Sequence, residues 1–199
     1  MTRAIEGTLA CALLGCYWGV ARGQMRELGY RLSMRSRSAA PAIAAAAGIS
    51  FVALHESALP WGAAAVVPCL AVCALTDIHA GYVFDAVLLL GALAIVPALV
   101  AADWARHAGG SLAGTAFLAA PYLLSRGRAI GLGDVKLAAL AGAALGWPAI
   151  GVALWCAFVA GGAFAAGALA ARRLRRGAQV PFAPFLAAGS CIAMLVRVG

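Results

Sequence analysis

Long apolar runs, separated by short polar segments, constrain the fold of this chain more than any other feature of its sequence. Of its 199 residues, 64% are hydrophobic and 11% are charged, and the mean hydropathy is +0.95. A soluble domain of this size cannot bury so much apolar surface. The composition therefore predicts an all-α fold, a polytopic helical bundle in a lipid bilayer.

The runs predict about eight transmembrane helices in a single membrane domain, residues 1–199. The longest run, 135–171, is interrupted by a Gly-Trp-Pro sequence at 146–148. Because one crossing needs about 20 residues, this run holds two crossings, of which the first, near 135–147, is short. The other runs lie at residues 4–20, 39–54, 60–76, 83–101, 111–124 and 179–196.

The basic residues orient this bundle. The chain has 15 Lys and Arg residues against 7 acidic ones, a net charge of +8. With eight alternating crossings, 12 of the 15 fall on the side of the first loop, residues 21–38. The positive-inside rule makes that side cytoplasmic, with 21–38 as a short basic cytoplasmic loop. The positive charge then indicates topology and contact with anionic lipid, not nucleic-acid binding.

The six cysteines all lie within apolar runs, and no CxxC motif occurs. This placement predicts neither a disulfide framework nor a metal site. Cys69 and Cys73 share one face of a helix, which leaves a metal or redox role open as an alternative. Packing as small apolar side chains is the better interpretation.

Two aspartates at the ends of apolar runs are the candidate catalytic residues. A carboxylate at a membrane boundary is costly and marks a functional site by default. On the predicted topology, Asp77 and Asp134 both lie at the cytoplasmic face. Two close carboxyl groups share a proton, so one can take a proton from water while the other polarises a carbonyl. This is acid–base peptide hydrolysis, without a covalent intermediate and without a cofactor.

Residues around Asp134 are candidates for binding substrate. Gly131 and Gly133 permit close backbone approach, and their amides are predicted to hold an extended substrate. Lys136 is a third candidate, with snorkelling to the interface as its alternative role. The small side chains at 138–146 predict a helix that approaches its neighbours closely, which would help to bring Asp134 toward Asp77.

Each candidate also has a purely structural interpretation. Asp77 can simply end a membrane span, and Asp134 can be an N-cap, the commonest role of Asp just before a helix. His79 can be an interfacial histidine. Asp85, at the start of a span, is expected to cap its helix or to pair with a nearby Arg.

Three segments, in order, resemble the type IV prepilin peptidases, membrane aspartic proteases of the GxGD class. The sequence GLGDVKL at 131–137 resembles the GxGD-x-KL block of that family. DIHAGYVFD at 77–85 resembles its D-x-R-x-x-x-I-P-N block more loosely, and VPFAPFLA at 180–187 resembles its IPFGPFLA segment. The departures are His79 for Arg, Phe84 for Pro, Asp85 for Asn and Ala183 for Gly.

The resemblance implies a function. Members of the family cleave the short basic leader from type IV prepilins and pseudopilins, after a Gly and just ahead of a hydrophobic helix. They act at the cytoplasmic face of the bacterial inner membrane and serve pilus assembly and protein secretion. The family's catalytic dyad carries over to Asp77 and Asp134.

The resemblance also predicts what this chain lacks. Many bacterial members carry a large domain after the first span, with paired CxxC motifs that resemble a zinc site. They also methylate the new pilin N-terminus with S-adenosylmethionine. Here the corresponding loop, 21–38, has no Cys, as in the reduced members that serve Flp/Tad pili. We therefore expect peptidase activity without methyl transfer and without a zinc site.

Three other interpretations remain. Presenilin-like intramembrane proteases share GxGD, but they have a Tyr-Asp pair and a PAL motif, whereas here Thr76 precedes Asp77 and residues 181–184 read PFAP. A small transporter could use the two aspartates as a proton relay, although such chains often show inverted repeats with paired broken helices. The third is an inactive assembly factor that keeps the fold.

Overall fold

The computed structural model describes residues 2–28, 61–100, 103–173 and 180–196, and the described chain is all helical, with no strand. The side chains of residues 2–11, 61–65 and 98 lie outside the description. The apolar run at 39–54, predicted as a span, also lies outside the described residues. The helices are α1 (Thr2–Glu27), α4 (Trp61–Ala80), α5 (Asp85–Val100), α6 (Trp104–Ser125), α7 (Leu132–Leu145), α8 (Ala149–Ala170) and α9 (Ala183–Val196).

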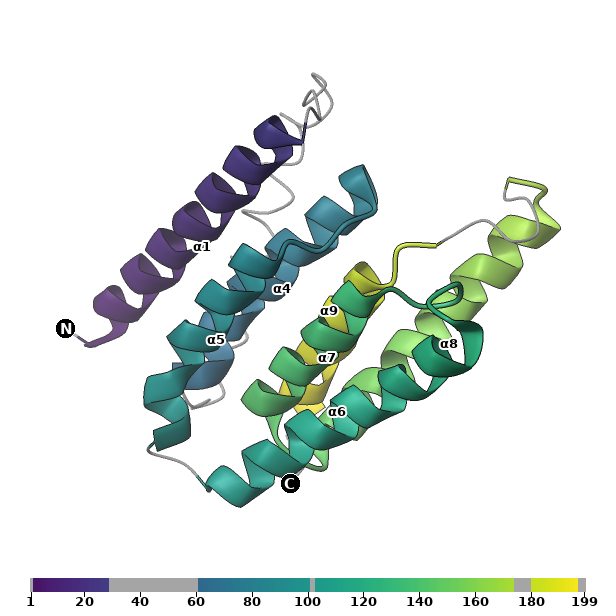
Figure 1. The fold of residues 1–199 in the computed structure, drawn as a ribbon. Coiled ribbons are helices and arrows are strands. Elements are labelled where there is room, and N and C mark those ends of the chain that lie inside the picture. The colour runs from purple at the N-terminus through teal and green to yellow at the C-terminus, as the bar shows by residue number, and fades with distance from the viewer. Residues whose placement is uncertain (1, 29–60, 101–102, 174–179, 197–199) are drawn as a thin grey trace.

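From α4 to α9 the chain passes back and forth through the bundle (Figure 1). The C-terminal ends of α1, α4, α6 and α8 therefore meet the N-terminal ends of α5, α7 and α9 at the upper end of Figure 1. The core lies between the helices and consists mainly of Ala, Leu and Val side chains. This arrangement gathers the short connections 81–84 and 126–131 at one end of the molecule.

The predicted helical class is confirmed for the described residues, whereas the eight crossings remain a prediction. Among these residues, one helix, α8, is both long and apolar enough to cross a membrane. Shorter apolar helices run from Val66 to Ala80, from Asp85 to Pro97 and from Ala183 to Val196. The predicted short crossing at 135–147 corresponds to α7, which has 14 residues.

The first predicted loop was placed too early. Residues 21–27, assigned to the basic loop 21–38, continue α1 to Glu27. The reason is a buried stripe at helical spacing, formed by Tyr17, Ala21 and Met25, each at most 2% exposed. The apolar face therefore extends past the first arginine, and the helix continues with it.

The polar segment 103–110 falls between the predicted spans 83–101 and 111–124, but α6 begins within it. The Asp103 carboxylate caps the helix by accepting the Ala105 N–H at 3.1 Å. Gly110 and Gly114 are buried and pack backbone to backbone against α7, where a Cβ on either would overlap a carbonyl of Gly142 or Ala138. The predicted close approach of the small-residue helix thus occurs, and its partner is α6.

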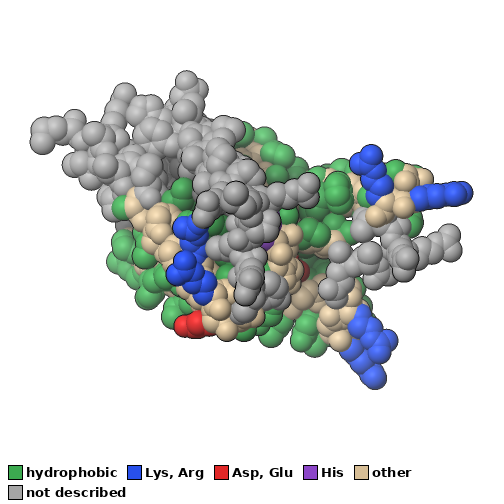
Figure 2. All heavy atoms as spheres, turned by 90° about the horizontal axis from the view of Figure 1, so that it is seen from above, with side chains coloured by type: hydrophobic (Ala, Val, Ile, Leu, Met, Phe, Trp, Pro, Cys, Tyr) green, Lys and Arg blue, Asp and Glu red, His purple; other side chains and the backbone are tan. Residues whose placement is uncertain are grey.

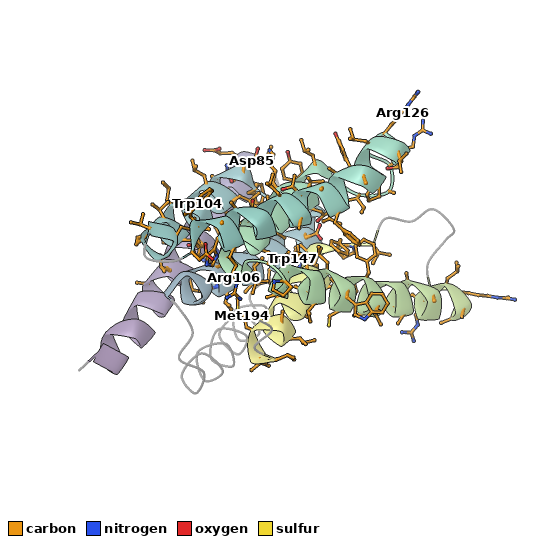
Figure 3. All side chains as sticks on the ribbon, turned by 90° about the horizontal axis from the view of Figure 1, so that it is seen from below. Asp85, Trp104, Arg106, Arg126, Trp147 and Met194 are labelled. Carbon is orange, nitrogen blue, oxygen red and sulfur yellow. The ribbon has the colours of Figure 1, made fainter. Side chains whose placement is uncertain are left out.

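The lower end of α6 is tied to the turn between α7 and α8. Arg106 and Trp147 lie next to each other (Figure 3) and bond in both directions. The Trp147 N–H donates to the Arg106 carbonyl at 3.0 Å, and the Arg106 Nε donates to the Trp147 carbonyl at 3.1 Å. In addition, His107 Nδ1 lies 2.7 Å from the carbonyl of Ala143. These bonds fix α6 and α7 relative to each other at the end opposite Asp134.

Candidate functional site: two carboxylates at one end of the bundle

Asp77 points into the bundle from the last turns of α4. It continues the buried face of this helix, which includes Val66, Leu70 and Cys73, and it is only 9% exposed. Its Oδ2 accepts the backbone N–H of Ala183 at 3.0 Å. Since Ala183 begins α9, the carboxylate lies at the positive end of a helix dipole.

Asp134 lies in the first turn of α7. Gly131 is the N-cap, and its N–H donates to Asp134 Oδ2 at 3.3 Å. Asp134 therefore stabilises the start of the helix from its third position and not, as the alternative had it, as the N-cap itself. Its other oxygen, Oδ1, is buried and accepts no hydrogen bond from any described residue. A buried carboxylate oxygen without a donor is an exception that calls for a functional explanation.

The two carboxylates, 57 positions apart in the sequence, come within electrostatic range of each other. Asp134 precedes the apolar stretch of α7, outside the predicted span. The pKa of Asp134 is raised from 3.8 to about 6, mainly by burial and also by the negative charge of Asp77, while the Gly131 N–H opposes both effects. A carboxyl group with such a pKa can exchange protons near neutral pH.

The segment that follows Asp77 packs against the start of α7. A Cβ on Gly133 would lie 3.0 Å from the Cβ of Val83, so the glycine permits this close approach. Lys136 Nζ contacts both carboxylate oxygens of Asp85, at 2.8 and 2.9 Å. Of the two roles expected of Asp85, pairing with an Arg is wrong, because its partner is Lys136 of α7. Asp85 does lie in the first turn of α5, where its charge favours the start of the helix.

The predicted substrate-binding residues therefore have structural partners of their own. The amide of Gly131 is bonded to Asp134, and the ammonium of Lys136 to Asp85. His79 is exposed, as expected of an interfacial histidine. Substrate contacts by Gly131, Gly133 and Lys136 stay a prediction.

One functional group was missed by the sequence analysis, the Ala183 amide that binds Asp77. The available signal was the VPFAPFLA segment, in which Pro181 and Pro184 flank Ala183 at the start of a helix. Among the described residues, no three His, Cys, Asp or Glu side chains gather in a group that could hold a metal ion. Cys69 and Cys73 are buried, and the Cys69 thiol donates to the Val87 carbonyl at 3.4 Å.

The basic side chains surround this site at a distance. Arg22 and Arg26 end α1, Arg126 and Arg128 follow α6, and the pair 172–173 follows α8, all at the upper end of Figure 1. Viewed from above, Arg and Lys side chains lie toward the margins of this end (Figure 2). Among basic residues with described side chains, Arg106 alone lies at the opposite end.

Comparison with known proteins identifies the family. A family model described as the type IV leader peptidase family matches residues 64–166, which include both aspartates. A Bacillus subtilis (strain 168) protein named prepilin leader peptidase/N-methyltransferase is 32% identical over 184 residues, which cover 87% of this chain and 71% of the relative. A protein of the same name from Aeromonas salmonicida (strain A449) is 36% identical over 90 residues, 43% of this chain and 31% of that relative. No solved structure matches. On this evidence, the chain belongs to the type IV leader peptidase family.

Proposed function

We propose that this protein is a membrane aspartic endopeptidase that removes the basic leader from type IV prepilins or pseudopilins. The observation that carries the proposal is that Asp77 and Asp134, both inside the region matched by the family model, are close enough for the charge of Asp77 to raise the pKa of Asp134. Neither the proton-coupled transporter nor an intramembrane protease with other substrates gains support from the family relationship.

The chemistry follows from a proton shared by the two carboxyl groups. The ionised member takes a proton from a water molecule as the water oxygen attacks the carbonyl carbon of the peptide bond. The protonated member donates its proton to the carbonyl oxygen. Collapse of the tetrahedral intermediate then breaks the C–N bond, and the leaving amine takes a proton from the pair. The buried Oδ1 of Asp134, which accepts no hydrogen bond from a described residue, and the Ala183 amide on Asp77 suit these roles.

We further propose that the protein is a single domain in the bacterial inner membrane, with about eight crossings and the site at the cytoplasmic face. The gathering of described basic side chains at the end that carries Asp77 and Asp134 supports this orientation. Gly131, Gly133 and Lys136 line the approach to Asp134, where an extended leader would lie. The proposed activity does not include methyl transfer, because the sequence between the first and second apolar runs contains no Cys.

The proposal is tested by reconstituting the protein in lipid with a prepilin that has a basic leader. Asp77→Asn and Asp134→Asn are each expected to reduce the cleavage rate at least about 10²-fold, because each removes one partner of the acid–base pair. Asp103→Asn is the matched control, since Asn also caps helices and this position lies at the other end of the bundle. Cleavage near the wild-type rate in either dyad variant would refute the assignment.

A further inference from the structure

The two carboxyl groups of the candidate site have unlike surroundings. Asp77 Oδ2 accepts the N–H of Ala183, from a helix other than its own, at 3.0 Å. Asp134 accepts one longer bond, from the Gly131 N–H to Oδ2 at 3.3 Å, and its buried Oδ1 accepts none from any described residue. Hydrogen bonds to a carboxylate favour its charged form, whereas burial without them favours the neutral form. The contacts of the pair therefore favour a charged Asp77 beside a protonated Asp134.

The start of α9 leaves a donor for Asp77. Pro184 has no N–H, and the Phe185 N–H donates to the Phe182 carbonyl at 3.0 Å. The Ala183 N–H is a donor of this first turn that the helix itself does not use. Because Ala183 is 0% exposed, water has no access to its N–H. The bond to the carboxylate is therefore a fixed part of the fold.

Asp77 depends on this donor to carry a charge. It is only 9% exposed, and burial by itself favours the protonated form of a carboxyl group. The Ala183 amide, at the positive end of the α9 dipole, offsets this cost for Asp77. Asp134 has no such compensation at Oδ1, and its pKa of about 6, due mainly to burial, agrees with a proton held there.

The other ionisable side chains around Asp77 leave the two aspartates as the groups that titrate together. The Cys73 thiol, one turn earlier on α4, and the Tyr17 phenol on α1 are buried, and such groups are neutral at neutral pH. From α7 the charged group is Asp134, α9 carries no charged residue, and Asp85 of α5 is paired with a lysine. The remaining described ionisable side chains at this end of α1 and α4 are exposed, namely Arg22, Arg26, Glu27 and His79.

We propose that the Ala183 amide is a positioning group that keeps Asp77 ionised, which makes Asp77 the general base of the reaction and Asp134 the general acid. The inference rests on the proposed peptidase function and assigns the two roles within the pair. Asp77 takes a proton from water as the water oxygen bonds to the carbonyl carbon, and Asp134 gives its proton to the carbonyl oxygen. As the C–N bond breaks, Asp77 passes its proton to the leaving amine, and Asp134 takes one from a hydroxyl of the intermediate. Both groups then return to their starting states.

The first experiment removes the Ala183 N–H and keeps the side chain. Semisynthesis of the C-terminal segment replaces the amide that precedes residue 183 by an ester, in which oxygen takes the place of N–H. The charged form of Asp77 then lacks its donor, so a higher pH is needed to ionise it. The acid limb of the pH profile of kcat/KM for prepilin should move up by about one pH unit or more, a roughly tenfold loss of kcat/KM below that limb. The basic limb, which reports the loss of the Asp134 proton, should stay in place.

An ester that precedes residue 185 is the matched control. It removes an N–H of the same helical turn, but one that donates to the Phe182 carbonyl and not to a carboxylate. The control should also lower Tm, yet it should move neither limb, and His79 is unchanged in both proteins. A shift of the basic limb in place of the acid limb would mean that the roles are reversed. That result, an unmoved acid limb, or an equal shift in the control would overturn the proposal, while cleavage by the unmodified protein would still uphold the peptidase.

The second experiment locates the proton without turnover and without a modified backbone. A protonated carboxyl group and a carboxylate have separate infrared bands. At about pH 5, roughly one unit below the pKa of Asp134, the protein in lipid should show the band of a buried protonated carboxyl group. Asp134→Asn should remove this band, whereas Asp77→Asn should keep it, because burial is the main cause of the high pKa of Asp134. Asp103→Asn, at the exposed cap of α6, is the control and should leave the band unchanged. A band that survives in Asp134→Asn would overturn the proposal.

Discussion

The contact between α6 and α7 makes a sharp prediction about two adjacent glycines. A Cβ on Gly110 would lie 2.6 Å from the carbonyl carbon and 2.7 Å from the Cα of Gly146, and closer still to the Gly142 carbonyl oxygen. All three are backbone atoms and cannot rotate away. A Cβ on Gly109 would have one neighbour, the Cβ of Trp147 at 4.0 Å. Gly110→Ala should therefore separate the two helices, whereas Gly109→Ala should not.

The difference in stability follows from two contributions. Both substitutions gain the helix propensity of Ala over Gly, worth about 1 kcal/mol. Only Gly110→Ala also overpacks the contact, which costs roughly 1–3 kcal/mol and more when backbone must move. Since the propensity gain is common to both, the two variants should differ by about 1–3 kcal/mol in the free energy of unfolding. For a chain of this size that is a difference of roughly 2–12 °C in Tm.

The assay is thermal unfolding of the purified variants in lipid nanodiscs, followed by tryptophan fluorescence. Gly109→Ala should melt at or slightly above the wild-type temperature, and Gly110→Ala should melt below Gly109→Ala. Because the two positions share helix, residue type and sequence change, the comparison isolates the contact with α7. Equal melting temperatures would show that α6 and α7 do not pack backbone to backbone here, and the placement of Asp134 would lose its support.

Two further predictions concern the residues around the carboxylates. The Lys136–Asp85 pair is exposed, with side chains 45% and 68% accessible. A double-mutant cycle with Lys136→Met and Asp85→Asn should therefore give a coupling energy of about 0.2–1 kcal/mol in the free energy of unfolding. A coupling energy of zero would rule out the pair as a link between α5 and α7. The pKa of Asp134, about 6 in the folded protein and 3.8 in the unfolded chain, means that folding favours the protonated form. At pH values above 6, Asp134→Asn should therefore raise Tm, and this gain in Tm should disappear as the pH falls toward 4. An equal gain in Tm at pH 4 and above pH 6 would contradict the buried environment of Asp134.

Much of the fold was predictable because apolar runs of helical length leave few choices for the backbone. The ends of the helices were not. At Arg22, charge marked the start of a loop, but the buried stripe through Ala21 and Met25 extends the helix beyond it. Gly109 and Gly110 lie outside the predicted spans, but Gly110 belongs to α6 and is needed for the contact with α7. Hydropathy reports what a residue prefers to contact and not how far its helix continues.

The candidate site, like the fold, could be predicted only in part from the sequence. Asp77 and Asp134 could be singled out because an isolated carboxylate in an apolar context is costly, whatever its partner. The Ala183 amide was missed, because every residue except proline has a backbone donor and only the neighbouring prolines indicated that a helix starts here. From the sequence, Lys136 and Asp85 could be identified only as two separate charges, and not as an ion pair.

The bond from Ala183 to Asp77 joins positions 106 residues apart, and its donor belongs to the last described helix. During translation, α4 and α7 leave the ribosome well before α9 does. A nascent chain can thus bring its two acids together while Asp77 still lacks its amide donor. Asp77 therefore gains this hydrogen bond only after the first residues of α9 have been synthesised.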